Sequence, residues 1–266
     1  MINNTNLYYE THGANDSDAL VLIAGFAQGA WTWTWQIEDL SKHFRVITFD
    51  PRGVSRSQIQ ENTTDSITLR TIADDVAALL EHLNIEKAHV LGASFGGFVA
   101  QEFALSSPHK LDKLILACTS FGGRNHVAPS LEVLTAFISH DDLNKSERIR
   151  KFMIPAFTPE FVASDFEVVE EVCRLRETNH VPTNVYLQQL QIATTFDAES
   201  RVGEITAETL VLSGAKDIVV PPQNSQNLAN AIPEAKLEII ENGGHLFFIE
   251  QAKQFNQTVK DFLESN

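Results

Sequence analysis

The chain has 266 residues, 43% of them hydrophobic, which is enough apolar material for one large core together with an insertion. Its 35 acidic and 20 basic residues give a formal net charge of -15, which disfavours nucleic acids and anionic membrane surfaces as partners. No apolar run approaches the roughly 18 residues of a membrane span, and residues 1–4 lack the basic and apolar character of a signal region. We therefore expect a soluble, cytoplasmic protein.

Strand and helix patterns alternate through the first half of the chain. Short apolar runs predict strands, and apolar residues at helical spacing, such as Leu69, Ile72 and Val76, predict helices. In chain order we predict strands over 7–11, 19–24 and 44–49, a helix over 67–83, a strand over 88–91, a helix over 95–106 and a strand over 111–117. Apolar strands separated by amphipathic helices indicate an α/β fold: a mostly parallel central sheet with helices on both faces and ligands at the carboxyl ends of its strands.

The alternation stops between residues 121 and 202, where several helical patterns broken by prolines follow one another. Strand and helix patterns then return in turn, over 209–213, 222–231, 236–240 and 247–263. We therefore expect a core domain formed by residues 1–120 and 203–266 and a helical insertion over 121–202.

The two cysteines, Cys118 and Cys173, stand in no metal-ligand spacing. They could pair with each other, but two buried, unreactive thiols in a reducing compartment is the simpler interpretation. No metal ion and no cofactor is expected.

Ser94 lies at an abrupt junction between the strand predicted over 88–91 and the helix that follows it. The stretch from Gly92 to Gly96 reads glycine-alanine-serine-phenylalanine-glycine, the glycine-x-serine-x-glycine elbow that projects a serine hydroxyl from a strand-to-helix turn. Ser94 is therefore the candidate nucleophile. The backbone N–H of Phe95 opens the helix and faces the place where an oxyanion would form.

With this elbow the chain resembles the α/β-hydrolase superfamily, and in particular its serine-nucleophile, esterase-like members that carry a helical cap. The resemblance implies that the insertion over 121–202 is a lid above the active site. A serine at the nucleophile position argues against the relatives that use aspartate, such as haloalkane dehalogenases and epoxide hydrolases.

A nucleophilic serine needs a base and an acid, which follow it in the order serine, acid, histidine. Of the nine histidines, His245 directly follows a predicted strand and its turn, so its ring would lie at the same sheet edge as Ser94. Asp217 follows the strand over 209–213, in a loop very similar to the acid-bearing loop of the family. The other family position for the acid, after the strand over 111–117, holds no carboxylate. The predicted catalytic residues are Ser94, Asp217 and His245.

The second oxyanion donor is expected from the loop after the strand over 19–24, and we assign it to the backbone N–H of Phe26. Relatives usually carry a histidine-glycine pair here, whereas this chain has Ala24 and Gly25. A side chain that often braces the loop is therefore missing. We expect Gln28 or Trp31 to brace the loop instead.

The insertion is rich in phenylalanine, and most of these side chains should belong to its core. We expect an apolar substrate pocket lined by Phe26, Phe95, Phe121 and Phe137. The expected partner is a small-molecule substrate. Several arginines of the insertion could instead steer an anionic partner such as a carrier-protein-linked ester.

The leading functional hypothesis is hydrolysis of carboxylic esters with apolar acyl or alcohol groups through an acyl-serine, the activity of a carboxylesterase. The resemblance leaves other chemistries open at the same residues: carbon-carbon bond hydrolysis, lactone hydrolysis, perhydrolysis and cleavage of carrier-protein methyl esters. A different class, a ligand-binding receptor on a hydrolase scaffold, also stays open. An intact set of Ser94, Asp217, His245 and both oxyanion positions weighs against it.

Overall fold

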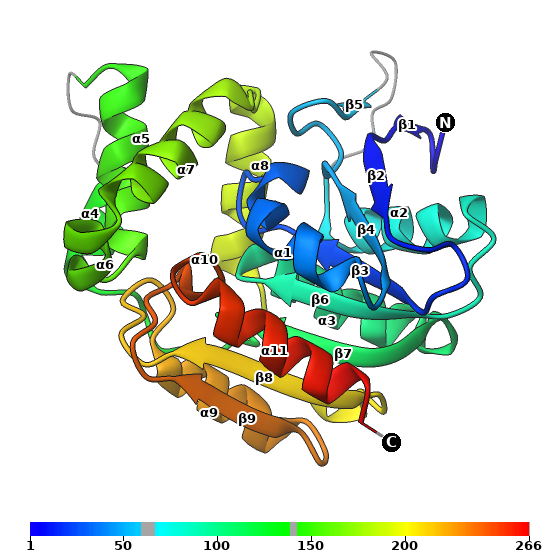
Figure 1. The fold of residues 1–266 in the computed structure, drawn as a ribbon. Coiled ribbons are helices and arrows are strands. Elements are labelled where there is room, and N and C mark those ends of the chain that lie inside the picture. Colours follow the sequence, from blue (N-terminus) through cyan, green and yellow to red (C-terminus); the bar gives the residue numbers. More distant parts are fainter. Residues whose placement is uncertain (60–66, 139–142, 266) are drawn as a thin grey trace.

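The computed structural model describes residues 1–59, 67–138 and 143–265. Within these ranges, seven strands form one sheet in the order β2-β4-β3-β6-β7-β8-β9, with β2 antiparallel to β4 and the other neighbours parallel (Figure 1). The strands are β2 (Tyr9–His12), β3 (Ala19–Ile23), β4 (Arg45–Phe49), β6 (Ala88–Ala93), β7 (Leu111–Ala117), β8 (Glu208–Gly214) and β9 (Lys236–Ile240). A separate antiparallel pair joins β1 (Thr5–Asn6) to β5 (Gln58–Ile59). The predicted mostly parallel sheet is confirmed.

Helices cover both faces of this sheet (Figure 1). One face carries α2 (Leu69–His82), α3 (Phe95–Ser106) and α9 (Pro222–Ala231), and the other carries α1 (Thr34–Leu40), α10 (Phe247–Glu250) and α11 (Ala252–Leu263). No helix of the described ranges combines the length and the apolar character needed to cross a membrane.

Strand β3 shows why helices are needed on both faces. All five of its residues are buried, and they alternate between two apolar clusters. Val21 and Ile23 join the cluster with α2 and α3, while Leu20 and Leu22 join the one with α1 and α11. Successive side chains of a strand point to opposite faces, so an entirely apolar strand must be covered on both.

Two helix predictions differ from the structure, one at its ends and one in its interior. The helix predicted from residue 67 begins at Leu69, because the Thr68 side chain accepts a hydrogen bond from the Thr71 backbone N–H and caps the first turn. The helix predicted over 247–263 is interrupted at Gln251, whose φ of -120° and ψ of 40° are not helical. The short α10 is thereby separated from α11.

Among the described residues, five α-helices lie between β7 and β8: α4 (Leu131–Ile138), α5 (Lys145–Met153), α6 (Pro159–Ser164), α7 (Phe166–Thr178) and α8 (Thr183–Thr195). We call residues 121–202 the helical segment. Figure 1 shows α4 to α7 as a group beside the core and α8 returning toward the sheet. Met153, Phe157, Val169 and Val172 join the apolar cluster of α1 and α11. Val185 of α8 joins the cluster of α2 and α3, so the segment contacts both layers. That it is a domain of its own, separate from residues 1–120 and 203–266, stays a prediction.

The junction of β6 and α3 is the tightest strand-to-helix contact that bears on the site. Ser94 has φ 55° and ψ -120°, a left-handed conformation that few non-glycine residues adopt. A Cβ atom on Gly96 would lie 2.1 Å from the carbonyl oxygen of Ile23, and one on Gly92 would lie 2.3 Å from that of Gly96. Only glycine lets α3 approach β3 and β6 this closely.

This close approach predicts the effect of adding one methyl group. Gly96→Ala should lower the free energy of unfolding by about 1–3 kcal/mol, because the helix must move away from the Ile23 carbonyl. Urea unfolding followed by circular dichroism measures the change. The matched control is Gly203→Ala, where the nearest atom would lie 3.5 Å from the new Cβ, in ordinary contact. Equal stability of the two variants would contradict the steric argument.

Candidate active site

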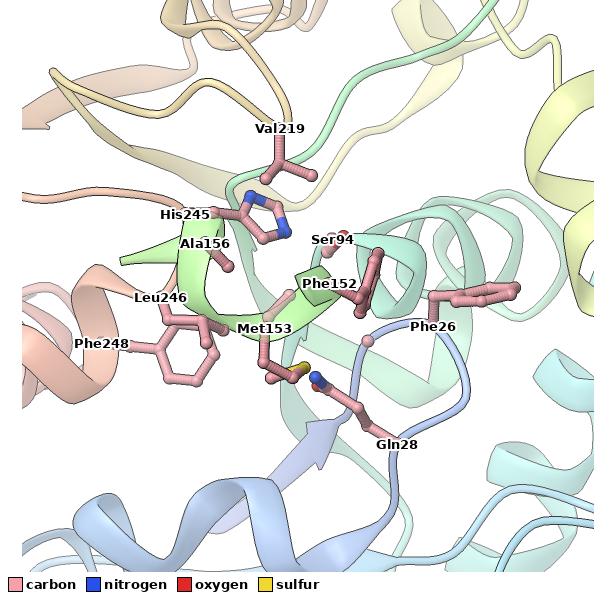
Figure 2. Close-up of a pocket in the computed structure, with 12 residues that line it drawn as sticks. Phe26, Gln28, Ser94, Phe152, Met153, Ala156, Val219, His245, Leu246 and Phe248 are labelled. Carbon is pink, nitrogen blue, oxygen red and sulfur yellow. The ribbon is translucent and has the colours of Figure 1, made fainter. Parts of the chain in front are cut away.

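Ser94 is held at the carboxyl end of β6 by its own backbone. Its N–H donates to the carbonyl of Ala117 over 2.9 Å, and its carbonyl accepts from the Gly97 N–H at 2.9 Å and from Thr119 Oγ1 at 2.8 Å. The side chain is half-buried and lines a pocket (Figure 2). The turn that the glycine pattern predicted thus presents the hydroxyl to a cavity.

The structure brings Asp217 and His245 into contact. His245 Nδ1 lies 2.8 Å from Asp217 Oδ2, and both residues are buried. The other carboxylate oxygen, Oδ1, accepts the backbone N–H groups of Val219 and Val220, each at 2.8 Å. An ionised carboxylate only accepts hydrogen bonds, so Nδ1 carries the hydrogen and Nε2 of the neutral ring is left as an acceptor.

The Asp217 and His245 loops are also joined to each other through their backbones. The Lys216 N–H donates to the Gly243 carbonyl at 2.9 Å. A Cβ atom on Gly214 would lie 2.2 Å from the Gly244 carbonyl oxygen, so glycine is required for this approach. The acid and the histidine therefore hold a fixed separation.

Ser94 and His245 line the same pocket, and Figure 2 shows a ring nitrogen of His245 directed toward Ser94. In the described part of the chain, no hydrogen bond joins the Ser94 hydroxyl to this ring. Catalytic hydrogen bonds are often long before substrate binds. The arrangement can pass a proton from a serine hydroxyl to an imidazole whose tautomer is fixed by a carboxylate.

Glu250 of α10, which was not predicted as a site residue, supports the loop that carries His245, which we call the histidine loop. Its carboxylate accepts the Gly244 N–H at 2.6 Å and also the Thr158 N–H, which belongs to the helical segment. Burial raises the pKa of Glu250, and the nearby Asp217 charge adds to the increase, while the two backbone donors oppose it. One buried side chain therefore connects the histidine loop to the helical segment.

The loop that carries Phe26 runs directly above the nucleophile. A Cβ atom on Gly25 would lie 3.5 Å from the Ser94 Cβ. Phe95 contributes the first N–H of α3, which has no acceptor within its own helix. Both positions assigned as oxyanion donors therefore adjoin Ser94.

In the described part of the chain, neither the Gln28 nor the Trp31 side chain hydrogen-bonds the loop backbone, although Gln28 Oε1 lies beside Gly25. Gln28 Oε1 accepts from the Thr32 hydroxyl at 3.3 Å, and Trp31 Nε1 has no partner among the described residues. The loop backbone instead donates to two distant side chains, from Ala30 to Asp50 at 2.8 Å and from Ala27 to Gln189 at 2.7 Å. Both acceptors come from other segments of the chain, so no local pattern pointed to them.

The pocket has a free volume of about 50 Å³ and is lined mostly by apolar side chains (Figure 2). Its lining residues are Gly25, Phe26, Gln28, Ala93, Ser94, Phe152, Met153, Ala156, Val219, His245, Leu246 and Phe248. Of the four predicted phenylalanines, Phe26 lines it. Phe95 and Phe121 instead pack in the apolar cluster beneath α2 and α3, and the Phe137 side chain lies outside the described residues. Phe152 and Met153 of α5 supply the apolar wall.

The two cysteines are free and buried, as the simpler interpretation predicted. Cys118 follows β7, at the other family position for the acid. Burial, reinforced by the Asp217 charge, raises its pKa well above the usual thiol range, and burial raises that of Cys173 to about 11. Both thiols are therefore neutral near pH 7. The described residues contain no group of three or more histidine, cysteine or acidic side chains that could hold a metal ion.

The raised pKa of Glu250 predicts a pH trend in stability. The Glu250 carboxyl binds a proton more tightly in the folded chain than in the unfolded chain. Its contribution to the free energy of unfolding is therefore most favourable below the unfolded pKa of about 4.3 and declines as the pH rises through the folded pKa. The stability advantage of wild type over Glu250→Gln should therefore shrink as the pH rises above about 4.3. Urea unfolding at several pH values measures it.

The control for this trend is Glu241→Gln, because Glu241 is exposed in the turn after β9. Its difference from wild type, measured at the same pH values, gives the effect of replacing an exposed glutamate. An advantage over Glu250→Gln that grew with pH would show that the two backbone donors outweigh burial at this carboxylate.

Known proteins resemble this chain along nearly its whole length. It is 30% identical to a protein of Agrobacterium fabrum named "Putative carbamate hydrolase RutD", in an alignment covering 97% of this chain and 98% of the relative. The enol-lactonase of Burkholderia xenovorans LB400 superposes with a TM-score of 0.85 and is 25% identical over 99% of this chain and 98% of that structure. A thermophilic esterase of Thermogutta terrifontis, solved with malate bound, gives a TM-score of 0.81 and is 26% identical over 97% of this chain and 92% of that structure.

A family profile described as "alpha/beta hydrolase fold" matches residues 18–172 and 174–252. These matched residues include the β6 elbow and the loops that carry Asp217 and His245. Because the profile spans most of the sequence, and because the relatives match along their full lengths, this chain is a hydrolase that belongs to the alpha/beta hydrolase family.

Proposed function

We propose that the protein is a serine esterase that cleaves small carboxylic esters through an acyl-enzyme. One observation carries the proposal: the buried Asp217–His245 hydrogen bond of 2.8 Å, in the wall of the pocket that Ser94 also lines. The acid fixes the histidine tautomer, and the histidine faces the serine. This is the arrangement that activates a hydroxyl for attack on a carbonyl.

In the proposed reaction, Ser94 Oγ attacks the ester carbonyl while His245 Nε2 takes the hydroxyl proton. The N–H groups of Phe26 and Phe95 stabilise the oxyanion that forms. His245 then gives its proton to the leaving alcohol as the carbon-oxygen bond breaks, which leaves an acyl-serine. Water, deprotonated by His245, hydrolyses this ester in the same two steps and releases the acid.

The pocket supports a short acyl group. A free volume of about 50 Å³ between apolar side chains favours a short acyl group over a long one. The helical segment supplies its wall through Phe152, Met153 and Ala156 and would act as a cap. We therefore propose acetyl-sized or propionyl-sized acyl groups.

A carbamate is a second candidate substrate. The RutD relative is 30% identical over nearly its whole length. A carbamate presents the same planar carbonyl as an ester, together with a nitrogen that needs polar neighbours. The side-chain amide of Gln28 lines the pocket together with Ser94 and His245, and Figure 2 shows its tip next to Met153. Gln28 would provide a hydrogen-bond partner for that nitrogen.

Removing the nucleophile tests the assignment directly. Ser94→Ala should reduce the turnover of p-nitrophenyl acetate by about a thousandfold or more, with the fold unchanged, because the loss removes the attacking group. Ser106→Ala is the control, because Ser106 ends the same helix and its hydroxyl makes no hydrogen bond in the described residues. Retention of more than about a tenth of the wild-type rate by Ser94→Ala would reject the nucleophile.

The pocket volume predicts the acyl preference. We expect kcat/KM for p-nitrophenyl acetate to exceed that for the octanoate by at least about tenfold, since a longer chain must displace the apolar wall. Met153→Ala should move the optimum toward butyrate. A phenyl carbamate, a lactone and a carbon-carbon substrate belong in the same assay. A rate for any of these above that for the acetate would replace the ester proposal.

Labelling separates an activated serine from a binding protein without knowledge of the natural substrate. A fluorophosphonate should phosphonylate Ser94, because its tetrahedral adduct places an oxygen at the proposed oxyanion site. Peptide mass spectrometry should locate the adduct, and His245→Ala protein should react far more slowly. A folded wild-type protein that stayed unmodified would favour the receptor hypothesis.

A further inference from the structure

A side chain of the helical segment binds the loop after β3 that carries Phe26, which we call the oxyanion loop. The Ala27 N–H donates to Gln189 Oε1 over 2.7 Å, between residues 162 positions apart. Ala27 and Gln189 are each only 1% exposed. Solvent therefore cannot replace Gln189 as the acceptor without a rearrangement of the loop.

The bond acts on the residue next to the proposed donor. Ala27 has a φ of 53°, a conformation that costs of order 1–3 kcal/mol for a non-glycine residue and persists only when the surroundings impose it. The peptide that carries the Ala27 N–H begins at Phe26, so fixing this peptide restricts the direction of the Phe26 N–H. On the other side, the loop is fixed where the Ala30 N–H donates to Asp50.

A second contact from the same helix acts on the same loop. Tyr186 lies three residues before Gln189 on α8 and therefore shares its face. Its ring packs edge-on against Phe26, with 4.8 Å between the ring centroids. One face of α8 thus contacts the side chain of Phe26 and binds the backbone of Ala27.

We propose that Gln189 is a positioning residue that aligns the Phe26 N–H for the oxyanion. Its side chain hydrogen-bonds the loop backbone, which the side chains of Gln28 and Trp31 do not do among the described residues. The role depends on the helical segment being seated on the core, because the acceptor is carried by α8. This inference rests on the proposed function, in which Phe26 is an oxyanion donor.

The test compares Gln189→Leu with Gln188→Leu. Gln188 is a matched control because it lies on the same helix and its Oε1 accepts the Ile67 N–H at 3.0 Å, away from the pocket. With p-nitrophenyl acetate, Gln189→Leu should lower kcat by about tenfold to a hundredfold with little change in KM, because misplacing one donor weakens binding of the transition state. Gln188→Leu should stay within about twofold of wild type in kcat.

The conservative variant separates positioning from packing. Gln189→Glu keeps an oxygen acceptor at the same reach, so we expect it to recover most of the lost kcat and the rate of fluorophosphonate labelling. Gln189→Asn draws the acceptor back by one methylene and should behave like Gln189→Leu. This second variant decides the question if the leucine variant does not fold.

Three outcomes would overturn the inference. The first is that folded Gln189→Leu or Gln189→Asn has the same kcat as Gln188→Leu. The second is that Gln189→Leu raises KM and leaves kcat unchanged. The third is that folded Gln189→Glu is as slow as Gln189→Leu. Failure of the proposed function has a different signature, because wild type itself would then neither turn over esters nor react with the fluorophosphonate.

Discussion

The close approach of α3 to β3 is the constraint on which the site depends. Gly96 lies so near the Ile23 carbonyl that no side chain fits between them. This contact turns the chain sharply at Ser94 and holds it in a left-handed conformation. The same contact places the first N–H of α3 beside the loop after β3, so that one packing event positions the candidate nucleophile and both candidate oxyanion donors.

The loops of Asp217 and His245 meet this elbow at the carboxyl edge of the sheet. Strands β6, β7, β8 and β9 are parallel neighbours, so the loops that follow them emerge on the same side. Every oxygen of the Asp217 carboxylate has a donor, which leaves His245 with a fixed ring orientation. A parallel sheet thus brings together groups that lie more than a hundred residues apart in the chain.

The helical segment touches both halves of the site through buried polar contacts. The Thr158 N–H binds Glu250, which also binds the histidine loop, and Gln189 binds the oxyanion loop. Buried backbone donors are costly to leave unpaired. Displacement of the segment would therefore disturb both loops together with the pocket wall. The position of the segment on the core therefore affects the geometry at Ser94 as well as the wall of the pocket.

The central sheet and most of its covering helices could be predicted from the sequence, and Ser94, Asp217 and His245 could be named as candidate catalytic residues. These features rest on local signals: strand and helix periodicity, two glycines at fixed spacing, and polar residues directly after apolar strands. Three features came only from the folded structure: Gln189 binds the loop that carries Phe26, Glu250 binds the loop that carries His245, and Phe152 and Met153, rather than Phe121, line the pocket. These contacts join residues that lie far apart in the sequence, and no local pattern relates such residues to each other. They follow from how the helices pack.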